Sequence, residues 1–153
     1  MIRKIVLLVI LALLFSGCSG SNPKAKITSV MYVETINAGG VYYNFEGKDN
    51  IQITLDFTFD DNLASGLDQT SDDYRDDLFV ILVKGAHFYY DDQEVELVYG
   101  YWPKEAGSNY AKEMTLFYVV PSDHSVQSLR FVYDGDVLGE GASSIDTMIE
   151  PEK

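Results

Sequence analysis

Cysteine and histidine are both scarce in this chain of 153 residues. Cys18 is the only cysteine, so an intramolecular disulfide is excluded, and an exported domain must take its stability from a hydrophobic core. His87 and His124 are the only histidines. A structural zinc site needs three or four Cys, His or carboxylate ligands. We therefore expect no structural zinc site, and the sequence indicates no other cofactor.

Positive charge is scarce as well. Lysine and arginine number 11 against 24 aspartates and glutamates, which gives a formal net charge of −13. Binding to nucleic acid requires a surface rich in Lys and Arg, and so does adhesion of a domain to anionic lipid head groups. The charge balance therefore argues against a nucleic-acid partner and against adhesion of the domain itself to anionic lipid head groups. It favours a simpler role, in which the acidic residues keep an exported domain soluble.

The apolar run near the start of the chain is short. Residues 5–15 are eleven uninterrupted apolar residues, whereas a membrane-spanning helix needs about 20. Arg3 and Lys4 precede the run and the small residues Ser16 and Gly17 follow it, which is the order of a cleaved secretory signal. We predict that residues 1–17 are removed. Nine basic and 24 acidic residues then remain, a formal charge of −15.

The end of this signal is similar to the bacterial lipobox, in which small residues precede a cysteine that is acylated and exposed by cleavage. The residues that carry the resemblance are Leu14, Phe15, Ser16, Gly17 and Cys18, and leucine is usual where Phe15 stands. The resemblance implies a lipoprotein with Cys18 as the lipidation site, carrying palmitate or similar chains. The alternative is an ordinary cleaved signal with an unrelated cysteine.

The implied location is the extracytoplasmic face of a bacterial cell membrane, where the acyl chains anchor the protein. The outer membrane is the alternative in a Gram-negative cell, because Ser19 after Cys18 gives no inner-membrane retention signal. Residues 18–24 are turn-forming and polar, and we expect a lipidated flexible tether there. We expect one domain over 25–142 and a loose acidic tail over 143–153, with local order at 145–149.

Alternating apolar and polar residues predict a mostly β domain. The clearest alternation places apolar side chains at every second residue of 51–59, which indicates a strand with one wet face. Residues 27–35 and 41–45 are expected to form a hairpin around the turn at 37–40. No segment after the signal has convincing helical periodicity with caps, so helices should be short or absent.

The second half of the chain completes the predicted strands. The apolar run 78–83 is expected to be a central strand, bent at Gly85 and continuing through 87–90, which pairs back with 95–99. Residues 114–120 and 126–133 are expected to pair around a turn at 121–123. Seven or eight strands predict an all-β fold, a two-sheet antiparallel β-sandwich.

Three of these segments resemble the immunoglobulin-like domains of unknown function found in many Gram-positive lipoproteins. They are the long alternating strand 51–59 and the closing pair 114–122 and 129–133. The resemblance implies an immunoglobulin-like sandwich on the cell surface and supplies no catalytic residues. The segment 60–77 is longer and more acidic than that family suggests, and no cysteine pair brackets Trp102, so an antibody-type domain is not supported.

Residues that could support catalysis are few. Ser122, Asp123 and His124 are consecutive, and a catalytic triad needs groups that converge from different parts of a fold, so we interpret them as a polar turn. We expect His87 to be an ordinary strand residue. Paired carboxylates could perform glycoside hydrolysis, but among 24 acids a suitable pair arises by chance. We therefore predict that the protein is not an enzyme and assign no catalytic residue.

Two groups of residues remain as candidate binding features. Seven carboxylates between 60 and 77 could ligate calcium, which takes six to eight oxygens, yet they lack the spacing of a known calcium loop. A solvated acidic loop is the expectation there, and no metal ligand is assigned. The acids are Asp60, Asp61, Asp68, Asp72, Asp73, Asp76 and Asp77.

Tyrosine and tryptophan exceed what an alternating core requires. Neighbouring aromatics on a strand point to opposite faces, so one of each pair is either exposed or covered by another layer, and the sequence leaves both open. Exposed Tyr and Trp suit protein or sugar surfaces. The residues are Tyr42, Tyr43, Tyr89, Tyr90, Tyr99, Tyr101, Trp102 and Tyr110.

The sequence therefore favours a non-enzymatic, membrane-anchored lipoprotein that binds a protein or a glycan of the cell envelope. Two alternatives remain: a carboxylate-dependent extracellular hydrolase, and a calcium-stabilised structural module.

Overall fold

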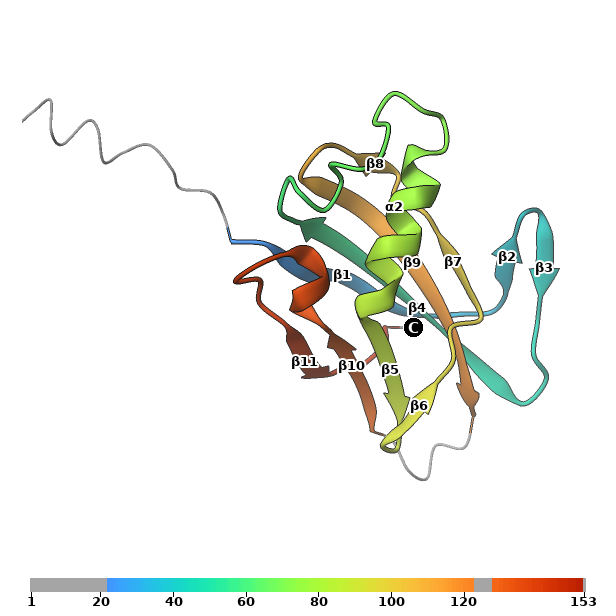
Figure 1. Ribbon diagram of the computed structural model, residues 1–153. Helices are drawn as coiled ribbons and strands as arrows, with labels where there is room; N and C mark the ends of the chain where they lie inside the picture. Colours follow the sequence, from blue (N-terminus) through green and yellow to red (C-terminus); the bar gives the residue numbers. More distant parts are fainter. Residues whose placement is uncertain (1–21, 123–127, 153) are drawn as a thin grey trace, which may run out of the picture.

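Two antiparallel sheets pack against one shared apolar core in the computed structural model, which describes residues 22–122 and 128–152 (Figure 1). The first sheet has the strand order β1-β4-β9-β7, with β8 paired to β9 at one end. The second has the order β11-β10-β5-β6. The predicted all-β class and sandwich-like arrangement are thus confirmed, whereas an immunoglobulin-like strand arrangement stays a prediction.

The strands of the first sheet are β1 (Lys24–Val33), β4 (Lys48–Thr58), β9 (Tyr110–Pro121), β7 (Tyr99–Tyr101) and β8 (Glu105–Ala106). Those of the second are β11 (Ile145–Met148), β10 (Leu129–Tyr133), β5 (Ala86–Tyr90) and β6 (Gln93–Val95). A separate hairpin joins β2 (Ile36–Ala38) to β3 (Val41–Tyr43). The helical elements are α2 (Tyr74–Leu82) and two 3-10 turns, η1 (Val83–Gly85) and η2 (Gly135–Leu138).

The alternating strand predicted at 51–59 is confirmed as β4, at the centre of the first sheet. Ile51, Ile53 and Leu55 are fully buried, and the residues between them are only half-buried. Aromatic pairs link the two sheets across the core. The ring of Phe88 on β5 lies 4.6 Å from that of Tyr118 on β9, within the preferred range for aromatic pairs.

The prediction of a central strand at 78–83 is wrong, because residues 78–82 belong to helix α2 and Val83 begins η1. Tyr74, Leu78 and Leu82 are spaced by four and are buried, so they form one stripe that packs on the core. Val80, on the other side of the helix, is 56% exposed. A continuous apolar run fits a buried strand and a helix equally well, and here tertiary packing decides the outcome. The strand predicted to follow begins at Ala86, immediately after η1.

The predicted strand pairings are correct in part. The turn at 37–40 does form a hairpin, but it joins only the short β2 and β3, while the long β1 pairs with β4. The hairpin of β5 and β6 is confirmed, although the chain then crosses to the first sheet, where β7 pairs with β9. The closing pair is wrong: β9 and β10 belong to different sheets.

The prediction of a loose tail over 143–153 is wrong for the residues described, although the local order expected at 145–149 is present. Residues 145–148 form β11, which pairs with β10 along four residue pairs. Glu152 then exchanges two backbone hydrogen bonds with β1: its N–H donates to Val30, and its carbonyl accepts from Tyr32. The domain therefore extends to the end of the described chain. At its start, Lys24 of the predicted tether is already the first residue of β1.

None of the helices in the described ranges is long and apolar enough to cross a membrane.

Candidate functional site: an aromatic surface on the β2–β3 hairpin

An aromatic surface forms where the β2–β3 hairpin lies on the first sheet near β7. We define it as Tyr42, Tyr43, Phe45, Tyr99 and Tyr101. The Tyr43 and Phe45 rings are stacked at 6.5 Å, and Tyr99 and Tyr101 meet edge to face at 5.3 Å. Figure 1 places this hairpin at the end of the molecule opposite the point where the chain enters β1. The surface is thus built from two segments that are far apart in the sequence.

Glycine geometry makes the hairpin turn tight. Gly39 and Gly40 form its two-residue loop, with φ of 62° and 90°. Positive φ at both positions is what a type I′ turn demands, and glycine meets that demand without strain. The Asn37 side chain accepts a hydrogen bond of 2.9 Å from the Gly40 N–H and closes the loop. All three residues of β3 are consequently displayed to solvent.

Two apolar side chains outside the core are buried close to the contact between the hairpin and Tyr101. Ile36 and Phe117 are 1% and 4% exposed, yet neither belongs to the core between the sheets. The Phe117 ring lies 5.7 Å from that of Tyr101, and the Tyr101 hydroxyl donates to the Asn37 carbonyl, next to Ile36. Full burial of such a side chain contributes about 1.5–3 kcal/mol. The hairpin is therefore packed on the domain rather than only tethered to it.

The pKa of the Tyr101 hydroxyl is raised above its ordinary value. Burial raises its pKa, and the neighbouring Tyr99 and Tyr42 raise it further because their ionised forms would repel a second phenolate. Tyr101 therefore keeps its proton in the neutral range and remains a hydrogen-bond donor to Asn37.

Of the aromatic residues singled out from the sequence, some are exposed to solvent and others are partly covered by the rest of the domain. Tyr42 is 69% exposed and Tyr43 46% exposed, and both belong to the aromatic surface. Trp102 and Tyr110 are also exposed but lie outside it. Tyr89 is partly covered by Arg130, whose guanidinium lies 5.4 Å from its ring centre. The remaining residues, Tyr90, Tyr99 and Tyr101, are half-buried.

Phe45 and Phe117 were not predicted from the sequence to take part in a binding surface. Phe117 lies on the outward-facing side of β9, where alternation predicts a solvated residue. Its ring lies 5.7 Å from that of Tyr101 on β7, and no local pattern predicts that contact. A bulky apolar residue on the polar face of an alternating strand is the one available signal.

Of the residues considered for catalysis from the sequence, the structure describes His87 and Ser122. The Nδ1 atom of His87 lies 2.6 Å from the Glu94 carboxylate on the adjacent strand, and both side chains are exposed. This is a cross-strand surface pair of the β5–β6 hairpin. The Ser122 hydroxyl donates to the Gly47 carbonyl at 2.9 Å. Asp123 and His124 lie outside the described residues.

The acidic segment 60–77 uses several of its carboxylates in local turns. Asp60 accepts from the Asn62 N–H, and Asp68 accepts from both the N–H and the hydroxyl of Thr70. The hydrogen bonds from Thr70 lower the pKa of Asp68. Within 22–122 and 128–152, no three His, Cys, Asp or Glu side chains are grouped so that they could hold a metal ion. The last two acids, Asp76 and Asp77, lie in the first turn of α2, where the helix dipole favours negative charge.

Cys18, the predicted lipidation site, precedes the described residues. No family model matches the chain, and neither the curated proteins nor the solved structures contain a significant match to it.

Proposed function

We propose that the chain is a non-enzymatic lipoprotein, anchored through Cys18 at the extracytoplasmic face of a bacterial membrane, whose aromatic surface binds another protein of the cell envelope. The anchor is supported by the apolar segment 5–15 and the lipobox-like residues that follow it. The binding role is supported by one structural observation above all: Tyr42 and Tyr43 are exposed on a hairpin that packing and the Tyr101 hydrogen bond hold in place.

Fixed tyrosines suit binding because they offer a large contact area at low conformational entropy cost. An aromatic residue on a mobile loop would lose more entropy when a partner orders it. The anchored hairpin has already lost most of that freedom on folding. The aromatic surface is therefore preorganised to bind.

Two features favour a protein over a glycan as the partner. The aliphatic Val41, beside the aromatic surface, is 54% exposed, and an aliphatic side chain has no ring on which a sugar could stack. In addition, the outer edge of β3 has no strand beside it in the described part of the chain. An unpaired edge can accept an extended segment of a partner by β-augmentation. We therefore expect apolar contacts together with backbone hydrogen bonds.

Affinity capture with matched variants tests this proposal. The tagged protein is immobilised and exposed to the solubilised envelope of its own cells, alongside Tyr42→Ser with Tyr43→Ser, and alongside Val80→Ser on the exposed side of α2. We expect a discrete protein that the wild type and Val80→Ser retain and that the double variant loses at least about tenfold, or about 1.4 kcal/mol. Equal retention by all three proteins would contradict the proposed surface. Retention of envelope polysaccharide in place of protein would reassign the partner to a glycan.

A further inference from the structure

A groove lined with lysines lies at the end of the domain away from the aromatic surface. It encloses about 210 Å³ where the start of β1 lies beside β4 and β9. We call it the lysine groove and define it by Lys24, Lys26, Asp56, Thr58, Tyr110 and Lys112. Three of these residues are positively charged and one is negatively charged, in a chain whose net charge is −13. The residues that define the groove therefore carry a net positive charge, although the protein as a whole is acidic.

Most of this positive charge is not neutralised by neighbouring side chains. Lys24 and Lys26 form no ion pair with any described residue. The Lys112 ammonium lies 3.5 Å from the Glu105 carboxylate, and both side chains are more than half exposed, so water weakens that pair. The same ammonium lies 5.6 Å from the centre of the Tyr110 ring. All three ammonium groups thus remain able to bind an anion.

Two β-bulges flank the groove and orient its side chains. On β1, Thr28 is an extra residue between the pairs that Ile27 and Ser29 make with β4, and its hydroxyl donates to the Thr54 carbonyl at 3.1 Å. On β9, Lys112 and Glu113 together oppose the single residue Asp56. Bulges redirect side chains and are frequent beside functional sites.

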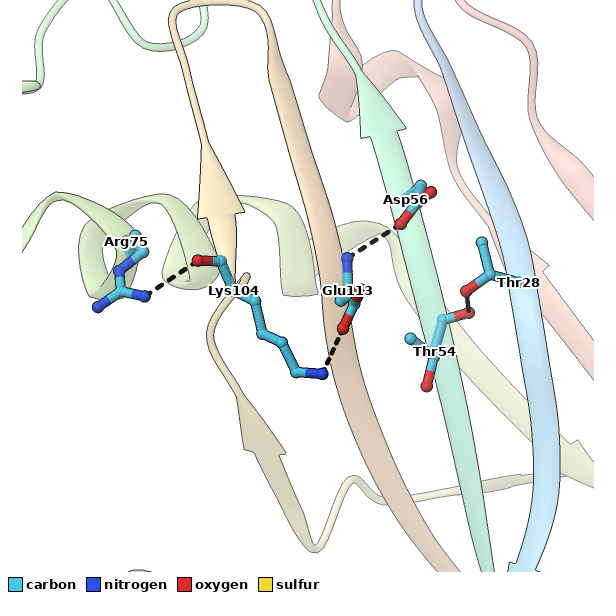
Figure 2. A network of polar contacts seen from close by, with 6 residues as sticks. All are labelled: Thr28, Thr54, Asp56, Arg75, Lys104 and Glu113. Carbon is cyan, nitrogen blue, oxygen red and sulfur yellow. Dashed lines mark hydrogen bonds and ion pairs between the residues drawn. The ribbon is translucent and has the colours of Figure 1, made fainter.

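The bulge on β9 separates two side chains of opposite charge. Glu113 adopts a φ of 55°, and its N–H donates to the Asp56 carboxylate at 2.9 Å (Figure 2). The Glu113 carboxylate pairs with Lys104, outside the groove, while Lys112 lines the groove. Asp56 accepts this backbone hydrogen bond and is also the cross-strand partner of Lys26, although the two side chains form no ion pair among the described residues.

Thr58 lines the groove, but its hydroxyl oxygen is shielded from solvent. The Thr58 oxygen is buried and has no hydrogen-bond partner among the described residues. The groups of the groove that can reach an anion are therefore its three ammonium groups. Ammonium groups form strong, charge-assisted hydrogen bonds with phosphate oxygens.

The position of the groove along the chain indicates where such a phosphate would come from. Lys24 is six residues after Cys18, and six extended residues span at most about 20 Å. If Cys18 carries the anchor, as the proposed function states, the groove lies at the membrane-proximal end of the domain. The ten residues of β1, at about 3.3 Å each, span about 33 Å between the groove and the end of β1 that leads to the β2–β3 hairpin. Figure 1 shows the hairpin at the end of the molecule opposite the start of β1.

We infer that the lysine groove binds the phosphate head group of an anionic phospholipid in the membrane that carries the anchor. The inference rests on the proposed lipid anchor. The net negative charge of the domain does not prevent this contact, because physiological salt screens charges beyond about 8 Å, so the nearest side chains dominate. Contact at the groove orients the domain so that the aromatic surface points away from the bilayer.

Vesicle binding tests the inference independently of acylation. The chain from residue 18 onward contains every described strand and helix, and Cys18→Ser makes it a soluble protein that cannot be acylated. Its affinity is measured for phosphatidylcholine vesicles with and without phosphatidylglycerol. Two triple variants carry the same charge change: Lys24, Lys26 and Lys112 to Gln in the groove, and Lys48, Lys84 and Arg75 to Gln elsewhere.

We expect binding only to the anionic vesicles, with a loss of about fivefold per groove lysine and less than about twofold in total for the matched control. Equal losses in the two variants would show nonspecific attraction and overturn the inference. Binding of inorganic phosphate without any preference for anionic vesicles would overturn the assignment to a lipid. If the groove fails this test while Cys18 proves to be acylated, the proposed function stands without the groove.

Discussion

The Tyr101 hydroxyl donates a hydrogen bond to the Asn37 carbonyl, and this contact ties β7 to a hairpin 64 residues earlier in the chain. The Phe117 ring lies beneath Tyr101 on the outer face of the first sheet. These contacts convert a short two-stranded hairpin, which alone is only marginally stable in water, into a fixed part of the domain. The aromatic surface depends on them.

Removing the Tyr101 hydroxyl should loosen the hairpin. We expect Tyr101→Phe to lower the free energy of unfolding by about 1 kcal/mol. Hydrogen exchange should accelerate at the amides of Val41 and Tyr43, which face β2. Tyr99→Phe is the matched control, since its hydroxyl makes no hydrogen bond with another residue of 22–122 or 128–152. Unchanged exchange in Tyr101→Phe would show that the apolar contacts alone hold the hairpin.

Alkaline pH should destabilise the domain through its buried phenols. Burial, together with the nearby Asp134, raises the pKa of Tyr133 above its ordinary value of 10.0. A folded pKa above the unfolded one means that this stabilisation is complete below about pH 10 and is lost as the pH rises toward the folded pKa. The free energy of unfolding should therefore fall above about pH 10.

Tyr133→Phe separates this phenol from the others. Its hydroxyl donates to the Leu82 carbonyl at 2.8 Å, so the variant should lose about 1–2 kcal/mol near neutral pH. Its stability should also decline less steeply between pH 10 and 12. Denaturant titrations across this range measure both effects. Parallel curves for the wild type and the variant would contradict the assignment to Tyr133.

Replacing Cys18 should abolish lipidation. The thiol is the predicted acylation site, so Cys18→Ser should give an uncleaved or soluble precursor that takes up no fatty acid. Metabolic labelling with a fatty-acid analogue measures this directly. Equal label on the wild type and the variant would contradict the anchor.

Calcium should have little effect on stability. Asp60 and Asp68 already accept hydrogen bonds within their own turns, so they would have to exchange those bonds for a metal ion. A tight site at a hundredfold saturation adds about 2.7 kcal/mol, on the order of 10 °C in melting temperature for a domain of this size. Melting with calcium, with magnesium and with chelator should show no calcium-specific shift of that kind. A large shift lost in Asp72→Asn with Asp76→Asn would identify a metal site.

The sequence predicts local features of this fold better than its long-range pairings. The alternation of β4 and the glycine turn of the β2–β3 hairpin are readable because one face is buried and two positions need positive φ. The helical state of 78–82 is not readable, since an apolar run has no intrinsic period, and its buried stripe appears only once the sheets supply a surface. The partner of β1 is undetermined for the same reason: adjacency in the sequence suggested β3, and burial selected β4.

The candidate site was only half predictable. Adjacent tyrosines on a strand require one exposed face, so Tyr42 and Tyr43 could be singled out from alternation. Nothing local connects them to Tyr101, because that contact depends on how the hairpin folds over the sheet. The lysine groove was missed because Lys24, Lys26 and Lys112 are scattered in an acidic sequence and meet only through the register of β1, β4 and β9.

Photo-crosslinking in intact cells tests the binding role most directly. A photoreactive amino acid replaces Tyr42 on the aromatic surface in one protein and Val80, 56% exposed on α2, in a control protein. We predict one discrete crosslinked protein at position 42 that is absent at position 80 and is lost when Cys18→Ser releases the domain from the membrane. The same adducts at both positions, or none at position 42, would contradict the proposal that the aromatic surface binds an envelope protein.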